Sequence, residues 1–153
     1  MATDYSWNKS AFLVIDMQEE MLNYFKGTCT LMGNQNQSLE TRGGVGTELV
    51  DGLVIKKEDY KLVKTRFSAF FATNLHLFLQ GAGVNRVIVT GVQTPNCIRQ
   101  TVFDAVELDY ESVSVIVDVT AAATPEIYAA NVVDMRNVGV ATPTLQQWCG
   151  SDG

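Results

Sequence analysis

The sequence predicts a single α/β domain in which helices cover both faces of a parallel sheet, a three-layer α/β/α architecture. Short apolar runs rich in β-branched residues alternate with segments whose apolar residues recur at helical spacing, a pattern typical of parallel sheets. The strand-like runs are almost continuously apolar, as expected for strands buried on both faces. A length of 153 residues and a hydrophobic content of 46% suit one domain spanning residues 1–153.

The predicted strands and helices follow one another in order along the chain. Strands are expected at 11–16, 60–65, 86–92, 112–119 and 138–142. Helices are expected at about 69–80, 95–108 and 125–136. Thr94-Pro95 and Thr124-Pro125 each place an N-capping residue before a proline suited to the first helical position. The carboxyl ends of such strands form the edge at which ligands of parallel α/β sheets bind.

One segment, at about 27–52, does not follow this pattern. It is rich in Gly, Asn, Gln, Ser and Thr, and its apolar residues have neither the period of a strand nor that of a helix. Irregular segments of this length are uncommon in compact domains. We therefore expect this segment to be functional, disordered, or the place where regular elements are absent.

Charge and composition exclude several classes of partner. The net charge of -6, with no run of Lys or Arg, indicates neither nucleic acid nor an anionic membrane as a partner. The N-terminal residues lack the apolar core of a signal peptide, and no apolar run approaches the roughly 20 residues of a membrane span. The three cysteines are far apart, which favours reduced thiols. We expect a cytoplasmic protein.

Cys97 lies where the strand at 86–92 gives way to a helix. If Thr94 caps that helix, Cys97 falls in its first turn, where unpaired N–H groups and the helix dipole stabilise a thiolate. A thiolate is the attacking species of cysteine enzymes. The alternative is an inert, buried cysteine, which is the usual state of an unpaired one.

Two charged residues lie at or near the ends of predicted strands. Asp16 follows "FLVI" and is a candidate base, because a carboxylate at the edge of a core needs a partner or a task; a helix-capping role is equally compatible with its position. Lys64, in "LVKTRFSAF", is either a charge of the same site or a lysine that reaches solvent from a buried stem.

Three stretches in this order, "FLVIDMQ", "VKTRFSAF" and "TGVQTPNCIRQT", resemble the isochorismatase-like cysteine hydrolases, which include the nicotinamidases. The stretches "VIVDVTAAATPE" and "GVATPTLQQW" are similar to those of plant members. The resemblance covers about residues 9–26 and 49–148. It implies a Rossmann-like fold and a catalytic triad of Asp16, Lys64 and Cys97.

The resemblance also implies how a substrate is held. A cis peptide bond is expected at Val92-Gln93, and the N–H groups of Gln93 and Cys97 are expected to form an oxyanion hole. Phe67 and Phe70 are candidate walls of an apolar substrate slot, although core packing explains them at least as well.

By resemblance, the expected activity is hydrolysis of the C–N bond of a small amide through a thioester, as in nicotinamidases, with no cofactor. One alternative is vinyl ether cleavage of the isochorismatase type, which in the family needs the aspartate but not the cysteine. Another is a catalytically weak, shortened variant that serves as an interaction or oligomerisation module. Family members form dimers or tetramers, so we expect a homo-oligomer that acts on a small-molecule substrate.

The chain departs from the family pattern in one place. Members carry a further βα unit between the first motif and the lysine motif, where this chain has the irregular segment at about 27–52. Nicotinamidases take their metal ligands from that unit. The chain has a single histidine, His76, and no second His or Cys at ligand spacing, so we expect no bound metal and a surface or packing role for His76.

Overall fold

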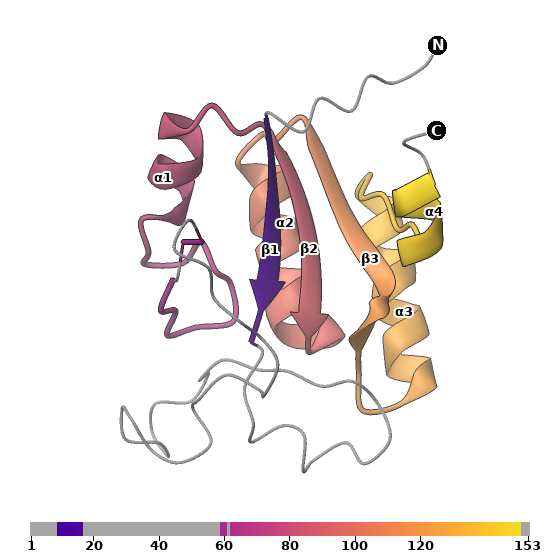
Figure 1. Ribbon diagram of the computed structural model, residues 1–153. Coiled ribbons are helices and arrows are strands. Elements are labelled where there is room, and N and C mark those ends of the chain that lie inside the picture. The colour runs from indigo at the N-terminus through magenta and orange to yellow at the C-terminus, as the bar shows by residue number, and fades with distance from the viewer. Residues whose placement is uncertain (1–8, 17–58, 61, 151–153) are drawn as a thin grey trace.

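A parallel sheet forms the centre of the protein. The computed structural model describes residues 9–16, 59–60 and 62–150, so the segment at about 27–52 lies outside the described residues. In the described part the sheet has the order β1-β2-β3 (Figure 1). The strands are β1 (Ser10–Ile15), β2 (Arg86–Val92) and β3 (Ser112–Ala121). Both strand pairs are parallel, so all three carboxyl ends lie at one edge.

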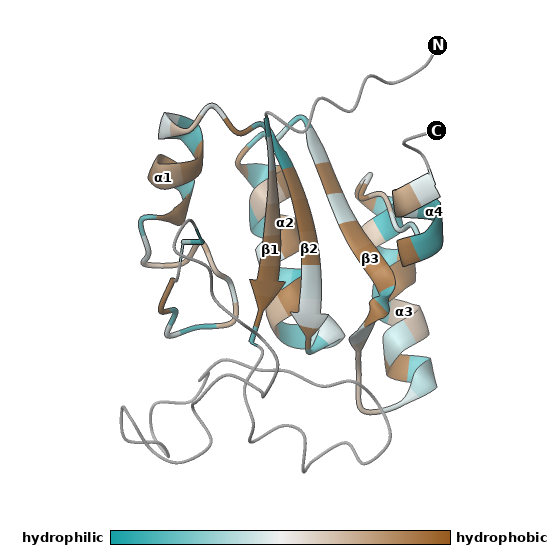
Figure 2. Cartoon of the chain, in the orientation of Figure 1, coloured by the Kyte–Doolittle hydropathy of each residue, from teal (hydrophilic) through white to brown (hydrophobic). Residues whose placement is uncertain are grey.

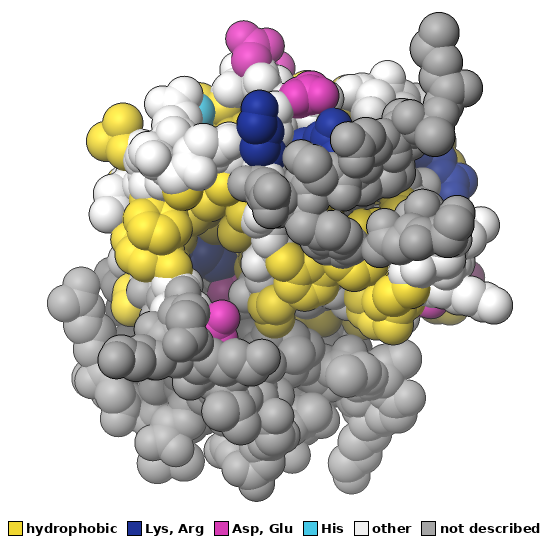
Figure 3. Space-filling view, turned by 45° about the horizontal axis from the view of Figure 1, so that its top comes forward, with side chains coloured by type: hydrophobic (Ala, Val, Ile, Leu, Met, Phe, Trp, Pro, Cys, Tyr) yellow, Lys and Arg dark blue, Asp and Glu magenta, His cyan; other side chains and the backbone are white. Residues whose placement is uncertain are grey.

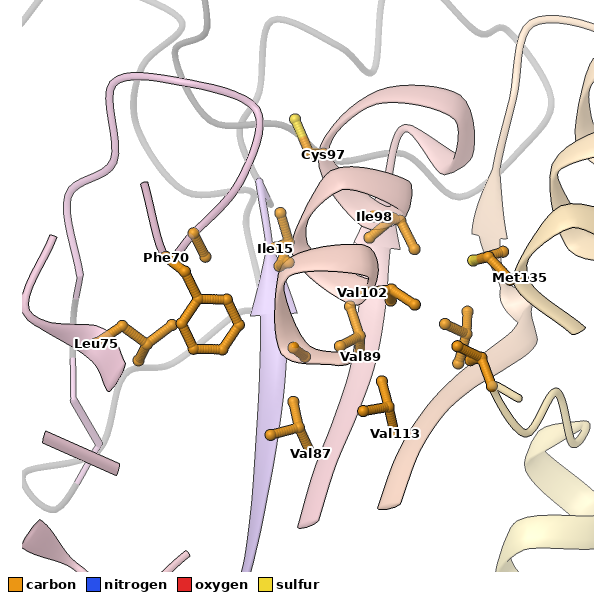
Figure 4. Packing of buried hydrophobic residues seen from close by; sticks show 14 of the residues in the cluster. Ile15, Phe70, Leu75, Val87, Val89, Cys97, Ile98, Val102, Val113 and Met135 are labelled. Atoms are coloured by element: carbon orange, nitrogen blue, oxygen red, sulfur yellow. The ribbon is translucent and has the colours of Figure 1, made fainter. Parts of the chain in front are cut away.

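Helices lie on both faces of this sheet. They are α1 (Leu75–Gly81), α2 (Arg99–Glu107), α3 (Pro125–Asn137) and α4 (Leu145–Gly150), with a π-helical turn η3 (Thr94–Ile98) leading into α2. The α2 face holds the core, in which Val102 packs with Val87 and Val89 (Figure 4). Phe12 points to the opposite face and stacks on Trp148 of α4, with ring centroids 5.7 Å apart. The fold is therefore α/β with helices on both sides.

The apolar pattern of the chain matches these layers. The strands carry mostly hydrophobic residues, whereas α2 and α3 mix hydrophobic and hydrophilic ones (Figure 2). Two predicted elements agree closely with the structure, the strand at 86–92 and the helix at 125–136. None of the helices in the described ranges is both long and apolar enough to cross a membrane.

The strand predicted at 60–65 is wrong. Within the described residues, 62–64 have no regular structure and 65–74 form bends and turns instead of a strand. The helix predicted at about 69–80 begins only at Leu75. Side chains compete for the backbone here, since the Phe70 N–H donates to Ser68 Oγ and the Thr73 hydroxyl donates to the Ala69 carbonyl. Ala72, with a φ of +52°, also interrupts a right-handed helix.

The strand predicted at 138–142 is reduced to a single bridge between Ser114 and Ala141. The Val115 N–H donates to the Ala141 carbonyl at 2.8 Å, and the Val117 N–H donates to the Pro143 carbonyl at 3.0 Å. This segment therefore runs along β3, but the pairing cannot continue in full, because Pro143 has no N–H to give back.

Candidate active site

Asp16, Lys64 and Cys97 meet at the carboxyl edge of the sheet. Lys64 Nζ lies 2.7 Å from Asp16 Oδ2 and 3.4 Å from Cys97 Sγ. The three residues come from segments far apart in the sequence. In the space-filling view a basic and an acidic side chain lie deep in a recess between hydrophobic side chains (Figure 3). The residues singled out in the sequence as a possible triad are thus one cluster.

The end of β1 places Asp16. Its backbone has a φ of +60°, in the left-handed region that aspartate tolerates better than most residues. Just before it, Ile15 pairs with Gly91 of β2. The side chain of Asp16 is only 3% exposed, and a carboxylate buried to this extent needs a charged partner. Lys64 is that partner.

Three contacts of its ammonium hold the side chain of Lys64. Its ammonium donates to the Arg66 carbonyl at 3.0 Å, in addition to its contacts with Asp16 and Cys97. Three acceptors match the three N–H groups of an ammonium. The Lys64 side chain is 7% exposed, so this arrangement satisfies a buried cation without water.

Cys97 lies in the π-helical turn η3 and has no solvent exposure. Burial, followed by the charge of Asp16, raises the pKa of its thiol well above the ordinary value, and the opposing effect of Lys64 is smaller. The prediction that the helix start stabilises a thiolate is therefore wrong. That argument took Thr94 as the helix cap, whereas Thr94 itself lies in η3 and the sulfur lies in the core beside a carboxylate.

Gln93 precedes the turn that carries Cys97. The Val92-Gln93 peptide bond is cis, as the resemblance implies. The Gln93 carbonyl accepts from the N–H groups of Asn96 and Ile98, and its side-chain oxygen accepts from Asn96 Nδ2 at 3.0 Å. These bonds hold the strand-to-turn connection beside the thiol; the oxyanion hole formed by Gln93 and Cys97 stays a prediction.

The two candidate slot residues lie in different environments. Phe70 is buried in the core, and its ring lies 5.7 Å from that of Tyr110 and edge-on to His76. Phe67, in contrast, is 41% exposed. Core packing accounts for Phe70, which leaves Phe67 as the candidate substrate contact.

His76 belongs to this aromatic cluster. Its Nδ1 lies 3.1 Å from the Tyr110 hydroxyl, and the two rings meet edge to face. Over the described residues, no three side chains of the His, Cys, Asp and Glu types gather as a metal site would require. The structure therefore gives His76 a packing contact.

One residue of the site region was missed in the sequence. The Thr101 side chain, fully buried on α2, accepts a hydrogen bond from the Ala69 N–H at 3.0 Å. The signal in the sequence is a threonine four residues after Cys97, on the same side of the helix as that cysteine. Its partner cannot be found from spacing, because Ala69 is 32 residues away.

Comparison with known proteins assigns the family. Residues 29–147 match the isochorismatase domain model, and the chain belongs to the isochorismatase domain family. An isochorismatase family protein of Desulfovibrio vulgaris has the same fold, with a TM-score of 0.80 and 29% sequence identity. The match covers 94% of this chain and 97% of that one.

Two curated relatives are similar to part of this chain. A probable inactive nicotinamidase of Arabidopsis thaliana is 69% identical over 108 residues, which are 70% of this chain and 55% of that protein. A ureidoacrylate amidohydrolase of an Enterobacter species is 39% identical over 89 residues, 58% of this chain and 38% of the relative. The chain thus matches about half or less of the length of these relatives.

Proposed function

We propose that this protein is a cysteine hydrolase that cleaves the C–N bond of a small amide through a thioester. The observation that carries the proposal is the position of Lys64 Nζ, in contact with both Asp16 and Cys97. Membership of the isochorismatase domain family supports it, as does similarity to a ureidoacrylate amidohydrolase.

The first half of the reaction forms the thioester. Because burial keeps the thiol of Cys97 protonated, attack needs a base, and Asp16 is the carboxylate in reach. Asp16 takes the thiol proton while Cys97 Sγ bonds to the amide carbon. Asp16 then returns that proton to the leaving nitrogen, the C–N bond breaks, and ammonia departs from an amide with an unsubstituted nitrogen.

The second half restores the enzyme. Asp16 takes a proton from water, and the resulting hydroxide attacks the thioester carbon. The C–S bond breaks, the acid is released, and Asp16 returns the proton to Cys97 Sγ. Lys64 keeps one positive charge beside whichever of the carboxylate and the sulfur is negative, so its ammonium supports both halves of the reaction without moving.

Backbone N–H groups and one exposed ring complete the proposed site. The N–H groups of Gln93 and Cys97 would hold the carbonyl oxygen as it gains charge, and Phe67 would contact a flat substrate. This chemistry needs no cofactor. We also propose that the protein is cytoplasmic and forms a homo-oligomer.

A second candidate is a catalytically weak interaction module. It is favoured by the relative from Arabidopsis thaliana, which is described as probably inactive. In that case the triad would be a buried structural ion pair with a neutral thiol, and the fold would serve for assembly with similar chains. Measured hydrolysis of an amide distinguishes the hydrolase from the interaction module.

The proposal is tested by turnover on a panel of small primary amides and carbamoyl compounds. The wild-type protein should release ammonia. Asp16→Asn keeps the size of the side chain and tolerates the left-handed backbone, yet it should lose about 10²–10⁴-fold in rate because the base is gone. Cys97→Ser should lose at least as much through its poorer nucleophile. Ammonia release and circular dichroism are measured for each variant.

Cys149→Ser is the matched control, because Cys149 is exposed and distant in sequence from the triad. It should keep the wild-type rate. No turnover by the wild-type protein on any amide would favour the interaction module. Activity on an enol ether that survives Cys97→Ala but not Asp16→Asn would favour vinyl ether cleavage.

A further inference from the structure

The segment that carries Lys64 is not held in place by strand pairing within the described residues. The described part of the sheet begins with β1, and the segment that carries Lys64 forms no strand against it. A lysine on a strand is held in register by ladder hydrogen bonds. Here something else must keep its ammonium within 2.7 Å of Asp16 and 3.4 Å of Cys97.

A second contact joins the same two segments. The Ala69 N–H donates to Thr101 Oγ1 at 3.0 Å, and both residues are buried. Ala69 lies five residues after Lys64, and Thr101 lies four residues after Cys97. The Lys64–Cys97 and Ala69–Thr101 contacts therefore join corresponding points of the two segments, which places the lysine segment along the face of the cysteine helix.

Other contacts hold Ala69 in place beside Thr101. Phe70, the next residue, is buried in the core beside Leu75 (Figure 4). The Ala69 carbonyl accepts from the Thr73 hydroxyl at 2.6 Å. Both backbone polar groups of Ala69 are thus satisfied by threonine hydroxyls, and only Thr101 belongs to another segment.

We propose that Thr101 is a positioning residue that holds Lys64 against Asp16 and Cys97 by accepting the Ala69 N–H. Without this acceptor the N–H is buried and unpaired, a state that proteins avoid. The segment at 64–70 relieves it by moving away from α2, and Lys64 moves with it. The consequence for turnover rests on the proposed function, whereas the position of Lys64 does not.

The test labels lysines in the folded, full-length chain. A short pulse of formaldehyde and borohydride methylates accessible amines, and peptide mass mapping gives the rate at Lys64 relative to that at Lys9, which is exposed. In the wild-type protein Lys64 should react much more slowly than Lys9. Thr101→Val keeps the shape and removes the acceptor, and it should raise the Lys64 rate about five- to tenfold, the change in local opening expected from one lost buried hydrogen bond.

Two further variants separate positioning from general stability. Thr101→Ser keeps the hydroxyl and should restore slow labelling of Lys64. Thr90→Val removes another buried threonine hydroxyl, which donates to the Val119 carbonyl at 2.7 Å, far from the lysine segment in sequence. It should leave the Lys64 rate at the wild-type value. If Thr101→Val also lowers the turnover rate with little change in KM, Thr101 positions Lys64 for the reaction.

The outcomes distinguish the two proposals. An unchanged Lys64 rate in Thr101→Val, or an equal rise in Thr90→Val, overturns the positioning role whatever the turnover. Absence of turnover in the wild-type protein with the predicted labelling overturns only the proposed function. If Thr101→Val does not fold, Thr101→Ser decides the matter, because fast labelling of Lys64 in that folded variant contradicts the proposal.

Discussion

At the scale of single residues, Lys64 explains how two other polar groups remain buried. The Asp16 carboxylate is 3% exposed and the Cys97 thiol has no exposure. A buried carboxylate without a cation would be strongly unfavourable, and removing one partner of such a pair is more damaging than never forming it. The ammonium therefore has a structural task as well as the proposed catalytic one.

The raised pKa of Cys97 predicts how stability depends on pH. The folded protein keeps the thiol proton at a pH where the unfolded chain, with an ordinary value of 9.0, loses it. The unfolded state then binds fewer protons than the folded state, so the free energy of unfolding decreases as pH rises above about 9, by at most about 1.4 kcal/mol per pH unit from this group. Below pH 8 this contribution is constant.

Urea unfolding of the wild-type protein and of Cys97→Ser, from pH 7 to 10.5, measures this effect. Serine does not titrate in that range, so the difference between the two free energies should be constant up to about pH 8.5 and decline above it. Tyrosines and lysines titrate in both proteins and largely cancel. A difference that stays flat to pH 10.5 would mean that Cys97 has an ordinary pKa.

The residues of the site could be found in the sequence, but their protonation could not. Position marked Asp16, Lys64 and Cys97 only as candidates with alternatives, and the resemblance of three stretches to a known family is what grouped them. The thiol pKa depends on burial and on the distance to Asp16, and neither follows from position in a helix. Thr101 was missed for a similar reason, since its partner comes from a segment folded by tertiary contacts.

At the scale of elements, the close approach of β1 and β2 determines where the end of β1, next to Asp16, lies. Gly91 has a φ of +113° and pairs with Ile15, the residue before Asp16. A Cβ at Gly91 would lie 2.0 Å from the Ile15 carbonyl oxygen. Only glycine permits this approach, which brings the end of β1 against the strand that leads to Cys97.

Gly91→Ala should destabilise the protein by about 3 kcal/mol or more, from backbone strain together with a clash against the Ile15 backbone. Gly83→Ala is the matched control, because Gly83 also has a positive φ, +72°, but nothing lies within 4 Å of its Cβ position. It should lose only about 1–2 kcal/mol. Urea unfolding measures both; equal losses would show that the close approach of β1 and β2 has no energetic role.

The elements whose own residues specify them were predicted correctly. Those that depend on hydrogen bonding to distant segments were not. The strand at β2 and the helix at α3 have continuous apolar residues or clear capping signals, including the Thr124 side chain that accepts from the Ile127 N–H. The runs at 60–65 and 138–142 also have apolar residues. Whether such runs become strands depends on hydrogen-bonding neighbours, and these are not encoded locally.

At the scale of the whole molecule, the described chain assembles its site from three separate segments around a small parallel sheet. Asp16 directly follows β1, Cys97 lies in the turn after β2, and Lys64 lies in an irregular segment. The lysine reaches the other two without a strand of its own. Within the described residues, the position of Lys64 therefore depends on contacts other than strand pairing.

The central claim is that Cys97 carries an acyl group during turnover, and partitioning with hydroxylamine tests it most directly. With an amide that the protein hydrolyses, added hydroxylamine should intercept the thioester, so that hydroxamate forms at the expense of the acid while ammonia release continues. Cys97→Ala should form neither product. Acid formation with no hydroxamate at any hydroxylamine concentration, or hydroxamate formation by Cys97→Ala, would contradict the account.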